Sequence, residues 1–173
     1  MAANIELKAR CGDLNDAQSK CEALGAHFAA VLRQTDTYFR VATGRLKLRQ
    51  IEGQEAELIG YQRDNHTDAR ASEYLVAPQT DPSACHAALG KSLGILCVVR
   101  KERRLYLWEN VRIHLDRVEG LGEFIEFEAV VSDENSREDG FKKIAFLRDH
   151  FSIRDQDLVS TSYSDLLIQS ENC

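Results

Sequence analysis

Charged residues recur at every second position in several stretches of this chain. Near the N-terminus, Asn4, Glu6, Lys8 and Arg10 alternate with apolar residues. Successive side chains of a β-strand point to opposite faces, so this alternation places the polar groups together. Arginine and lysine bind phosphate oxygens, and carboxylates supply the hard oxygen ligands that Mg²⁺ and Mn²⁺ prefer. The pattern therefore predicts a strand face that handles phosphate together with a divalent metal.

The same bias returns in later stretches that read as strands. The further charged members of these faces are Arg45, Lys47, Arg49, Arg63, Lys101, Arg103, Arg112, Asp116, Glu126 and Glu128. If all the faces point into a closed barrel, nine basic side chains meet four acidic ones, an imbalance that a polyphosphate and a metal would resolve. The alternative is an open sheet whose charged faces are solvated and paired only weakly across strands. Alternation alone does not decide between the two.

The elements that position these faces are mostly strands. We predict strands over Ile5–Arg10, Asp36–Val41, Arg45–Ile51, Glu57–Arg63, Glu73–Val76, Leu96–Arg103, Leu105–Leu115 and Phe124–Val130, and helices over Leu14–Ala26, Ser83–Lys91 and Arg137–His150. Many strands with few crossovers favour antiparallel pairing and closure, which removes exposed sheet edges. The predicted fold class is α+β, a closed antiparallel β-tunnel of about eight strands with helices packed outside.

Length and composition are those of one soluble domain. With 173 residues, of which 43% are hydrophobic, the chain can bury one substantial core, so we assign residues 1–173 to a single domain. No apolar run approaches the ~20 residues needed to cross a bilayer, and the N-terminus turns polar early, so we expect a cytoplasmic protein without a membrane partner. The net charge of −6 argues against nucleic acid as a partner. Five scattered cysteines without a C-x-x-C pair are interpreted as reduced structural thiols.

Several segments, taken in order, resemble one known family. The start NIELKAR resembles the E-x-E-x-K signature of the CYTH family, which is named after bacterial class IV adenylyl cyclase and thiamine triphosphatase. Later segments resemble, in the same order, those of its class IV cyclase-like branch: DTYFRV, GRLKLRQ, LIGYQR, VVRKERRLY, VRIHLDRVEGLGEFIEFE and TSYSDLL. The resemblance covers nearly the whole chain and implies a tunnel that binds a triphosphate with one or two divalent metals.

Carried over by position, the resemblance implies roles for individual residues. Phosphate would be bound by Lys8, Arg45, Lys47, Arg49, Arg63, Lys101, Arg103 and Arg112. A Mg²⁺ or Mn²⁺ ion would be held by Glu6, Asp116, Glu126 and Glu128, and catalytic roles would fall to Lys8, Lys101 and Glu126. One departure is Asn4, which stands where the signature has its first Glu. A ligand charge is lost there, so the number of bound metals stays open.

Two chemistries fit such a site and its triphosphate-bearing small molecule. One is cyclisation of ATP to cyclic AMP and pyrophosphate, which the branch favours, and the other is hydrolysis of inorganic, thiamine or nucleoside triphosphate. A third reading, which Asn4 favours, is a non-catalytic protein that binds a polyphosphate or a nucleotide. His114 shares a predicted inward face and is interpreted as a hydrogen-bonded residue rather than a general base. The sequence leaves open whether the chain forms a homodimer.

Overall fold

The structure is a computed structural model that describes residues 2–62 and 70–170. This part of the chain forms eight strands, four α-helices and a short 3-10 helix. The strands are β1 (Ala2–Arg10), β2 (His27–Phe39), β3 (Arg45–Ile51), β4 (Ala56–Gln62), β5 (Arg70–Gln79), β6 (Ile95–Trp108), β7 (Val111–Val118) and β8 (Gly122–Val131). The helices are α1 (Leu14–Leu24), α2 (Pro82–Leu93), α3 (Arg137–His150) and α4 (Tyr163–Gln169), with the 3-10 helix at Asp155–Asp157.

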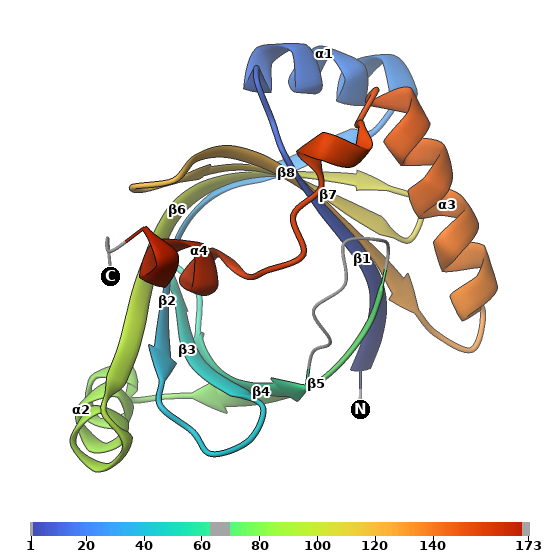
Figure 1. Ribbon diagram of the computed structural model, residues 1–173. Coiled ribbons are helices and arrows are strands. Elements are labelled where there is room, and N and C mark those ends of the chain that lie inside the picture. The colour runs from blue at the N-terminus through green and yellow to red at the C-terminus, as the bar shows by residue number, and fades with distance from the viewer. Residues whose placement is uncertain (1, 63–69, 171–173) are drawn as a thin grey trace.

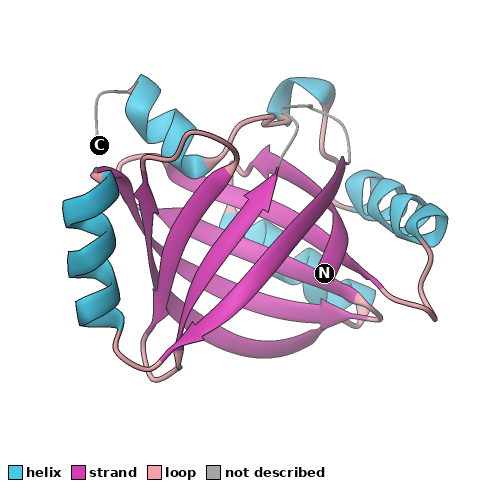
Figure 2. Ribbon diagram, turned by 90° about the horizontal axis from the view of Figure 1, so that it is seen from below, coloured by secondary structure: helices cyan, strands magenta, loops and turns pink. Residues whose placement is uncertain are grey.

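The strands close into a barrel, with the helices outside it or at its rim (Figure 1 and Figure 2). Their order around the barrel is β1-β5-β4-β3-β2-β6-β7-β8, and neighbouring strands are antiparallel. The chain runs from β2 to β5 and from β6 to β8 in two meanders. β1 completes the closure because it pairs with both β5 and β8. This arrangement confirms the predicted antiparallel β-tunnel, and each of the eight strands within residues 2–62 and 70–170 is paired on both sides.

The main apolar core lies outside the barrel, under helices α1 and α3. Ile5 of β1 and Phe127 of β8 are buried together with Ile144 and Leu147 of α3. Helix α3 can approach β1 closely because Gly140 has no side chain; a Cβ atom there would lie 2.9 Å from Ile5 Cγ1. Full burial of such side chains is worth about 1.5–3 kcal/mol each. Since the apolar strand faces point outward, the polar faces point into the barrel.

Helix boundaries follow local capping signals. Helix α3 coincides with the predicted Arg137–His150 and begins where the Ser136 side chain accepts a hydrogen bond from the Asp139 backbone N–H. Helix α1 ends at Leu24 rather than at the predicted Ala26, because Gly25 adopts a left-handed conformation with φ of 75°.

The predicted strand at Glu73–Val76 is shorter than β5, which spans Arg70–Gln79, and the predicted layout differs more strongly in three further places. Strand β2 begins at His27 rather than at Asp36. The predicted strand Leu105–Leu115 is in fact the end of β6 and the start of β7, joined by a turn at Glu109 and Asn110. Helix α4, which begins after the capping residue Ser162, was not predicted.

Two other expectations can be compared with the described residues. None of the helices within residues 2–62 and 70–170 is both long and apolar enough to cross a membrane. Cys11, Cys21 and Cys85 are free thiols, as expected. Cys97, however, is disulfide-bonded, which corrects the expectation that all five cysteines are reduced.

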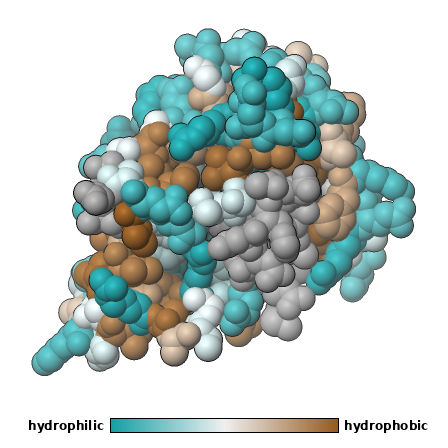
Figure 3. Space-filling view, in the orientation of Figure 1, coloured by the Kyte–Doolittle hydropathy of each residue, from teal (hydrophilic) through white to brown (hydrophobic). Residues whose placement is uncertain are grey.

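The face of the molecule shown in Figure 3 carries several apolar areas. In one of them, hydrophobic side chains gather near α2, at the lower left of the view. The exposed hydrophobic residues of α2 and the neighbouring segments are Val41, Leu93, Ile95 and Leu96. This area lies outside the barrel and is separate from the charged interior.

Candidate active site

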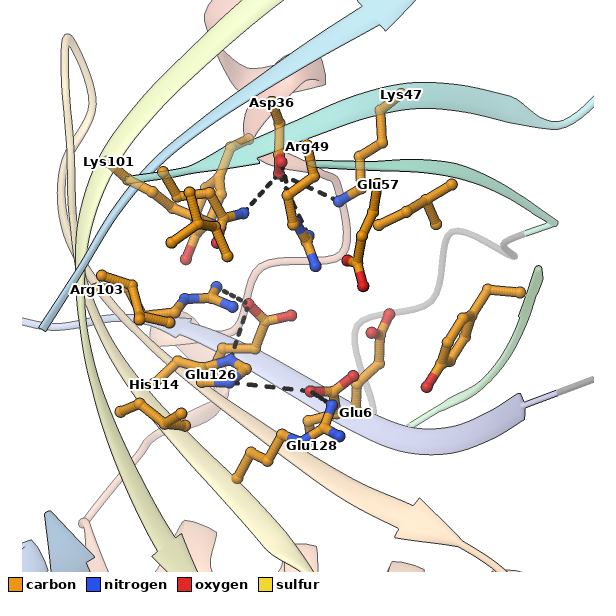
Figure 4. Close-up of a pocket in the computed structure, with 18 of the residues that line it drawn as sticks. Glu6, Asp36, Lys47, Arg49, Glu57, Lys101, Arg103, His114, Glu126 and Glu128 are labelled. Carbon is orange, nitrogen blue, oxygen red and sulfur yellow. Dashed lines mark hydrogen bonds and ion pairs between the residues drawn. The ribbon is translucent and has the colours of Figure 1, made fainter. Parts of the chain in front are cut away.

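The barrel interior contains a cavity of ≈ 520 Å³. The charged side chains that line it are Lys8, Lys47, Arg49, Lys101, Arg103 and Arg112, together with Glu6, Asp36, Glu57, Glu126 and Glu128. Figure 4 shows most of them projecting from different strands toward a shared space. Cavities of about 300–1,000 Å³ are typical of small-molecule sites. The charged strand faces therefore converge inside the barrel, as the alternation predicts.

Some of the predicted basic residues lie elsewhere. Arg45 points to α4, where its Nη1 donates to Ser162 Oγ (2.6 Å) and its Nη2 to Asp165 Oδ2 (2.8 Å). Arg10 is exposed, and its guanidinium lies 5.2 Å from the centre of the Phe124 ring. Arg63 falls outside the described residues. Only part of the predicted set is thus brought together.

Asp36 on β2 holds one group of cations at the cavity wall. Its buried carboxylate accepts hydrogen bonds from Lys47 Nζ (3.2 Å) and from Arg49 Nε and Nη2 (3.1 and 3.4 Å). Gln34 Nε2 donates to the same carboxylate at 2.9 Å. Burial opposes ionisation of Asp36, but the charges of Arg49 and Lys47 overcome it and hold the carboxyl pKa well below its usual range. Asp36 is therefore an ionised partner of both cations.

Two lysines of the cavity have depressed pKa values. Burial, reinforced by the charge of Arg49, lowers the pKa of Lys47 to about 7, although Asp36 acts in the opposite direction. Burial and the charge of Arg103 likewise lower the pKa of Lys101. Crowded cations disfavour one another's protonation, and a bound polyanion would favour it. Binding of a polyanion would therefore raise the pKa of both lysines and be favoured by their protonation.

Asp116 on β7 holds a second group of cations. It is fully buried and accepts hydrogen bonds from Arg103 Nε and Nη2 (2.7 and 2.6 Å) and from the Tyr163 hydroxyl (2.8 Å). Lys101 Nζ lies 3.8 Å from its Oδ2 atom. Burial opposes ionisation here too, yet the charges of Arg103 and Lys101 hold the pKa of Asp116 well below its usual range. This predicted metal ligand lies behind Arg103, outside the cavity lining.

Glu126 and Glu128 on β8 face the cavity beside His114 (Figure 4). Arg103 Nη2 donates to Glu126 Oε2 at 3.0 Å, and Arg112 Nη1 donates to Glu128 Oε2 at 3.3 Å. The two ring nitrogens of His114 lie 3.9 Å from Glu126 and 3.9 Å from Glu128. Burial and the charge of Arg103 lower the pKa of His114, so its ring is neutral near pH 7.

Oxygen donors suited to a divalent ion lie where β1 meets β8. Glu6 is directly opposite Glu128 in the strand pairing, and such facing like charges destabilise a sheet unless a cation offsets them. Asn4 Nδ2 donates to Glu128, while the buried Asn4 Oδ1 has no hydrogen-bond partner. These donor types fit Mg²⁺ or Mn²⁺. In the part of the chain that the structure describes, no three His, Cys, Asp or Glu side chains group closely enough to hold a metal ion as they stand.

Helix α4 contributes to the cavity from one rim of the barrel (Figure 1). Lys8 Nζ lies 4.0 Å and Lys101 Nζ 4.9 Å from the centre of the Tyr163 ring, so both ammonium groups make cation–π contacts. The hydroxyl group of the same tyrosine donates a hydrogen bond to Asp116. Helix α4 thereby contacts cations of both the N-terminal strand and β6.

Sequence reasoning missed Asp36, Glu57 and Tyr163 as parts of the site. A usable signal for Asp36 was its alternation with Gln34, which becomes visible once β2 is extended toward its true start. Glu57 was inside a predicted strand but was not singled out. Tyr163 belongs to a helix that the sequence did not predict.

A closed antiparallel barrel with arginines and lysines gathered in its interior is the architecture of a tunnel protein built around a multivalent anion. The chain belongs to the CYTH domain family, whose family model matches residues 2–163. The family resemblance inferred from the sequence is thereby confirmed.

Known proteins are similar to nearly the whole chain. A protein of Methanocaldococcus jannaschii named "Putative adenylate cyclase MJ0240" is 24% identical in an alignment that covers 94% of this chain and 97% of that protein. The PH1012 protein of Pyrococcus horikoshii is 26% identical, with a TM-score of 0.84 over 94% of this chain and 98% of its own. The fold is shared with a Hippeastrum protein whose structure is described as a "putative adenylyl cyclase" with a dominant triphosphatase activity (16% identity, TM-score 0.62, 100% and 97% coverage). Family membership and the cationic tunnel together support an enzyme that acts on a triphosphate.

Proposed function

We propose that this protein is a Mg²⁺- or Mn²⁺-dependent enzyme that binds a triphosphate inside its barrel, and that its first candidate reaction is the cyclisation of ATP to cyclic AMP and pyrophosphate. The observation that carries the proposal is the set of cations that share one cavity: Lys8, Lys47, Arg49, Lys101 and Arg103. The names of relatives support a triphosphate substrate without deciding the reaction.

The arginines are pre-positioned for phosphate. Arg49 and Arg103 each direct Nε and Nη2 to a buried aspartate. A guanidinium has five N–H donors in a fixed fork, so each arginine has further donors for phosphate oxygens. Because the aspartates fix the guanidinium orientation before binding, little reorganisation is needed as charge develops on a leaving phosphate.

The carboxylates and lysines have distinct proposed roles. Glu6, Glu126 and Glu128 would hold the divalent ion, which when bound neutralises phosphate oxygens and stabilises developing charge. Lys8 and Lys101 would bind phosphate oxygens beside Tyr163. If phosphate oxygens replaced Glu126 as the partner of Arg103, the Glu126 carboxylate would be available to help hold the ion.

A triphosphatase is the second candidate, and the described activity of the Hippeastrum neighbour is the observation that favours it. The same cations serve both reactions. A cyclase brings the ribose 3′ oxygen to the α-phosphorus, whereas a hydrolase places water behind the γ-phosphorus. The two reactions therefore differ in products rather than in the residues that bind phosphate.

The products formed from ATP with Mg²⁺ or Mn²⁺ test the proposal. Cyclic AMP with pyrophosphate identifies the cyclase, and ADP with phosphate identifies the triphosphatase. Arg103→Gln should lower kcat/KM about 100-fold, because it removes charge-assisted hydrogen bonds worth about 1.5–3 kcal/mol each. Arg33→Gln is the matched control, since Arg33 is exposed and pairs with Glu52 only at 3.8 Å. No turnover of ATP or inorganic triphosphate, despite binding of both, would contradict the enzyme and indicate a non-catalytic binder.

A further inference from the structure

His114 lies on the cavity wall beside two carboxylates, and one of its ring nitrogens is buried without a hydrogen bond. The side chain is only 5% exposed and lines the cavity. Across the strands it faces Glu126 on β8 and Leu105 on β6. Leucine offers no polar group, and Glu126 Oε2 lies 3.9 Å from Nδ1, so Nδ1 has no partner among the described residues. Burying a polar atom in this way is costly, which indicates that the ring is placed for a ligand.

Asn4 has an unpaired atom on the other side of the same carboxylates, since β8 lies between β7 and β1. It is 2% exposed and lines the cavity. Its Nδ2 atom donates to Glu128, whereas Oδ1 accepts no hydrogen bond from the described part of the chain. Glu128 Oε2 in turn lies 3.9 Å from His114 Nε2 (Figure 4). Both unpaired atoms therefore belong to one group, which consists of Asn4, Glu6, His114, Glu126 and Glu128.

The atoms of this group suit a cation. Asn4 Oδ1 can only accept hydrogen bonds, and a neutral imidazole carries a proton on one nitrogen and a lone pair on the other. With the proton on Nδ1, on the side of Glu126, the Nε2 lone pair is on the side of Glu128. The carboxylates would repel a phosphate group, whereas carboxylate oxygen, amide oxygen and imidazole nitrogen all bind divalent metals. A divalent ion is therefore the ligand that this group fits.

Only a small movement is needed for Nε2 to become a metal ligand. Neighbouring ligands at right angles around an ion, with bonds of about 2.1 Å, lie about 3 Å apart. The distance of 3.9 Å between His114 Nε2 and Glu128 Oε2 would thus have to shorten by about 1 Å. Rotation of the glutamate side chain can supply such a change while the strands stay in place.

We propose that His114 is a further ligand, through Nε2, of the divalent ion that Glu6 and Glu128 would hold, and that this nitrogen makes the site prefer a first-row transition-metal dication to Mg²⁺. The inference rests on the proposed function, which assigns the ion only oxygen ligands. The Nδ1–H group would then donate to Glu126, because the second nitrogen of a metal-bound histidine usually donates to a carboxylate, a carbonyl or water. Mg²⁺ is a hard cation that favours oxygen, whereas imidazole strengthens the binding of transition metals.

Pulsed electron paramagnetic resonance of Mn²⁺ bound to the full chain tests the new ligand directly. The second probe is the bis(methylene) analogue of inorganic triphosphate, which is not hydrolysed and contains no nitrogen. The spin echo should show modulation from a directly coordinated ¹⁴N nucleus. Labelling only the histidines with ¹⁵N should replace that modulation by the ¹⁵N pattern. This comparison uses the wild-type sequence, so it does not depend on whether a variant folds.

His114→Gln should remove the ¹⁴N modulation, because an amide oxygen then stands in place of the imidazole nitrogen. It should also lower about tenfold the Mg²⁺ concentration that displaces half of the bound Mn²⁺. His27→Gln is the matched control, since His27 is exposed and outside the cavity lining. The control should retain the modulation and stay within about twofold of the wild-type value.

Two failures can be told apart in these spectra. Bound Mn²⁺ without histidine modulation in wild type, or the same modulation and the same Mg²⁺ competition in wild type and His114→Gln, would overturn the inference and leave the metal-dependent function intact. A wild-type spectrum that shows only free Mn²⁺, at saturating concentrations of the triphosphate analogue, would overturn the metal dependence of the proposed function itself.

Discussion

Two buried carboxylates determine where the cations that we propose to bind phosphate point. Asp36 orients Lys47 and Arg49, and Asp116 orients Arg103. Negative charge inside an anion site weakens the net attraction for phosphate, yet without it the crowded cations would repel one another. Burial and repulsion already lower the pKa of Lys47. The aspartates therefore order the cations and oppose the loss of their charge before a ligand arrives.

Asp36→Asn should destabilise the protein by about 3–5 kcal/mol, because it leaves buried cations without their counter-ion. Triphosphate supplies a replacement charge, so the loss should be smaller when the ligand is saturating. Urea unfolding with and without inorganic triphosphate measures both values. Glu52→Gln, which removes an exposed partner of Arg33, serves as control and should change stability by less than about 0.5 kcal/mol. An equal loss of stability with and without triphosphate would contradict the proposed role of Asp36.

Lys47 should make triphosphate binding depend on pH. Its pKa of about 7 in the folded protein means that it is protonated below that pH and loses its proton as pH rises through it. A polyanion attracts the protonated form, so affinity should fall between about pH 7 and 9, and binding near neutral pH should take up protons. Calorimetry in buffers of different ionisation enthalpy measures the uptake.

Lys47→Arg is the matched variant for this pH dependence, because a guanidinium stays charged throughout the range. The variant should bind triphosphate with a flatter pH profile and less proton uptake. An identical pH profile in wild type and variant would show that another group titrates.

The alternation of residues along the strands predicted which side chains point into the barrel. It did not predict which partner each of these side chains contacts there. The cavity is reached as expected by Lys47, Arg49, Lys101 and Arg103. Residues two apart on a strand point to the same face, so one inward residue fixes the others. Arg45 is on the same strand face as Lys47 and Arg49. It lies at the end of the strand, however, and forms an ion pair with Asp165 of α4. Pairing at strand ends depends on tertiary contacts that a strand pattern does not contain.

At the scale of elements, α4 joins the C-terminal segment to the site. Arg45 binds both Ser162 and Asp165, and the Tyr163 ring contacts two lysines of the cavity. The helix has seven residues, too few to be stable alone, so these contacts hold it in place. Its position therefore depends on the same cations that are proposed to bind phosphate.

Arg45→Met should loosen α4 and leave the barrel intact, because it removes both polar contacts but retains an apolar stem. Hydrogen exchange of the amides in residues 163–169 should become at least tenfold faster, while that of β1 and β8 stays unchanged. Lys91→Met, a change of an exposed cation on α2, is the control. Unchanged exchange in α4 would show that Arg45 does not hold the helix.

The elements that the sequence predicted best are those with strong local signals. Strand β3 and helix α3 have the predicted bounds because alternation and capping are both clear there. The hairpin between β6 and β7 was missed because its turn, at Glu109 and Asn110, contains no glycine. The start of β2 was missed because Phe28–Leu32 is a continuous apolar run, and α4 because it is short.

For the whole molecule, the arrangement of polarity explains the function that we propose. Helices α1 and α3 cover the apolar outer faces of β1, β7 and β8, so the barrel can be stable with a charged interior. The charges inside are largely paired with one another across strands, which offsets the cost of placing them there. The sequence predicted the closed barrel and its charged lining from alternation and family resemblance. It did not single out Ile51 and Leu105, although they alternate in step with Arg49 and Arg103 and line the same cavity.

The central claim is that a triphosphate binds inside the barrel, and a crystal structure of the protein with inorganic triphosphate and Mn²⁺ tests it most directly. The account predicts triphosphate density within hydrogen-bond distance of Arg49, Arg103 and Lys101, and an anomalous manganese peak beside Glu126 and Glu128. Triphosphate bound only on the outer surface, or a barrel interior without triphosphate at saturating concentration, would contradict the account.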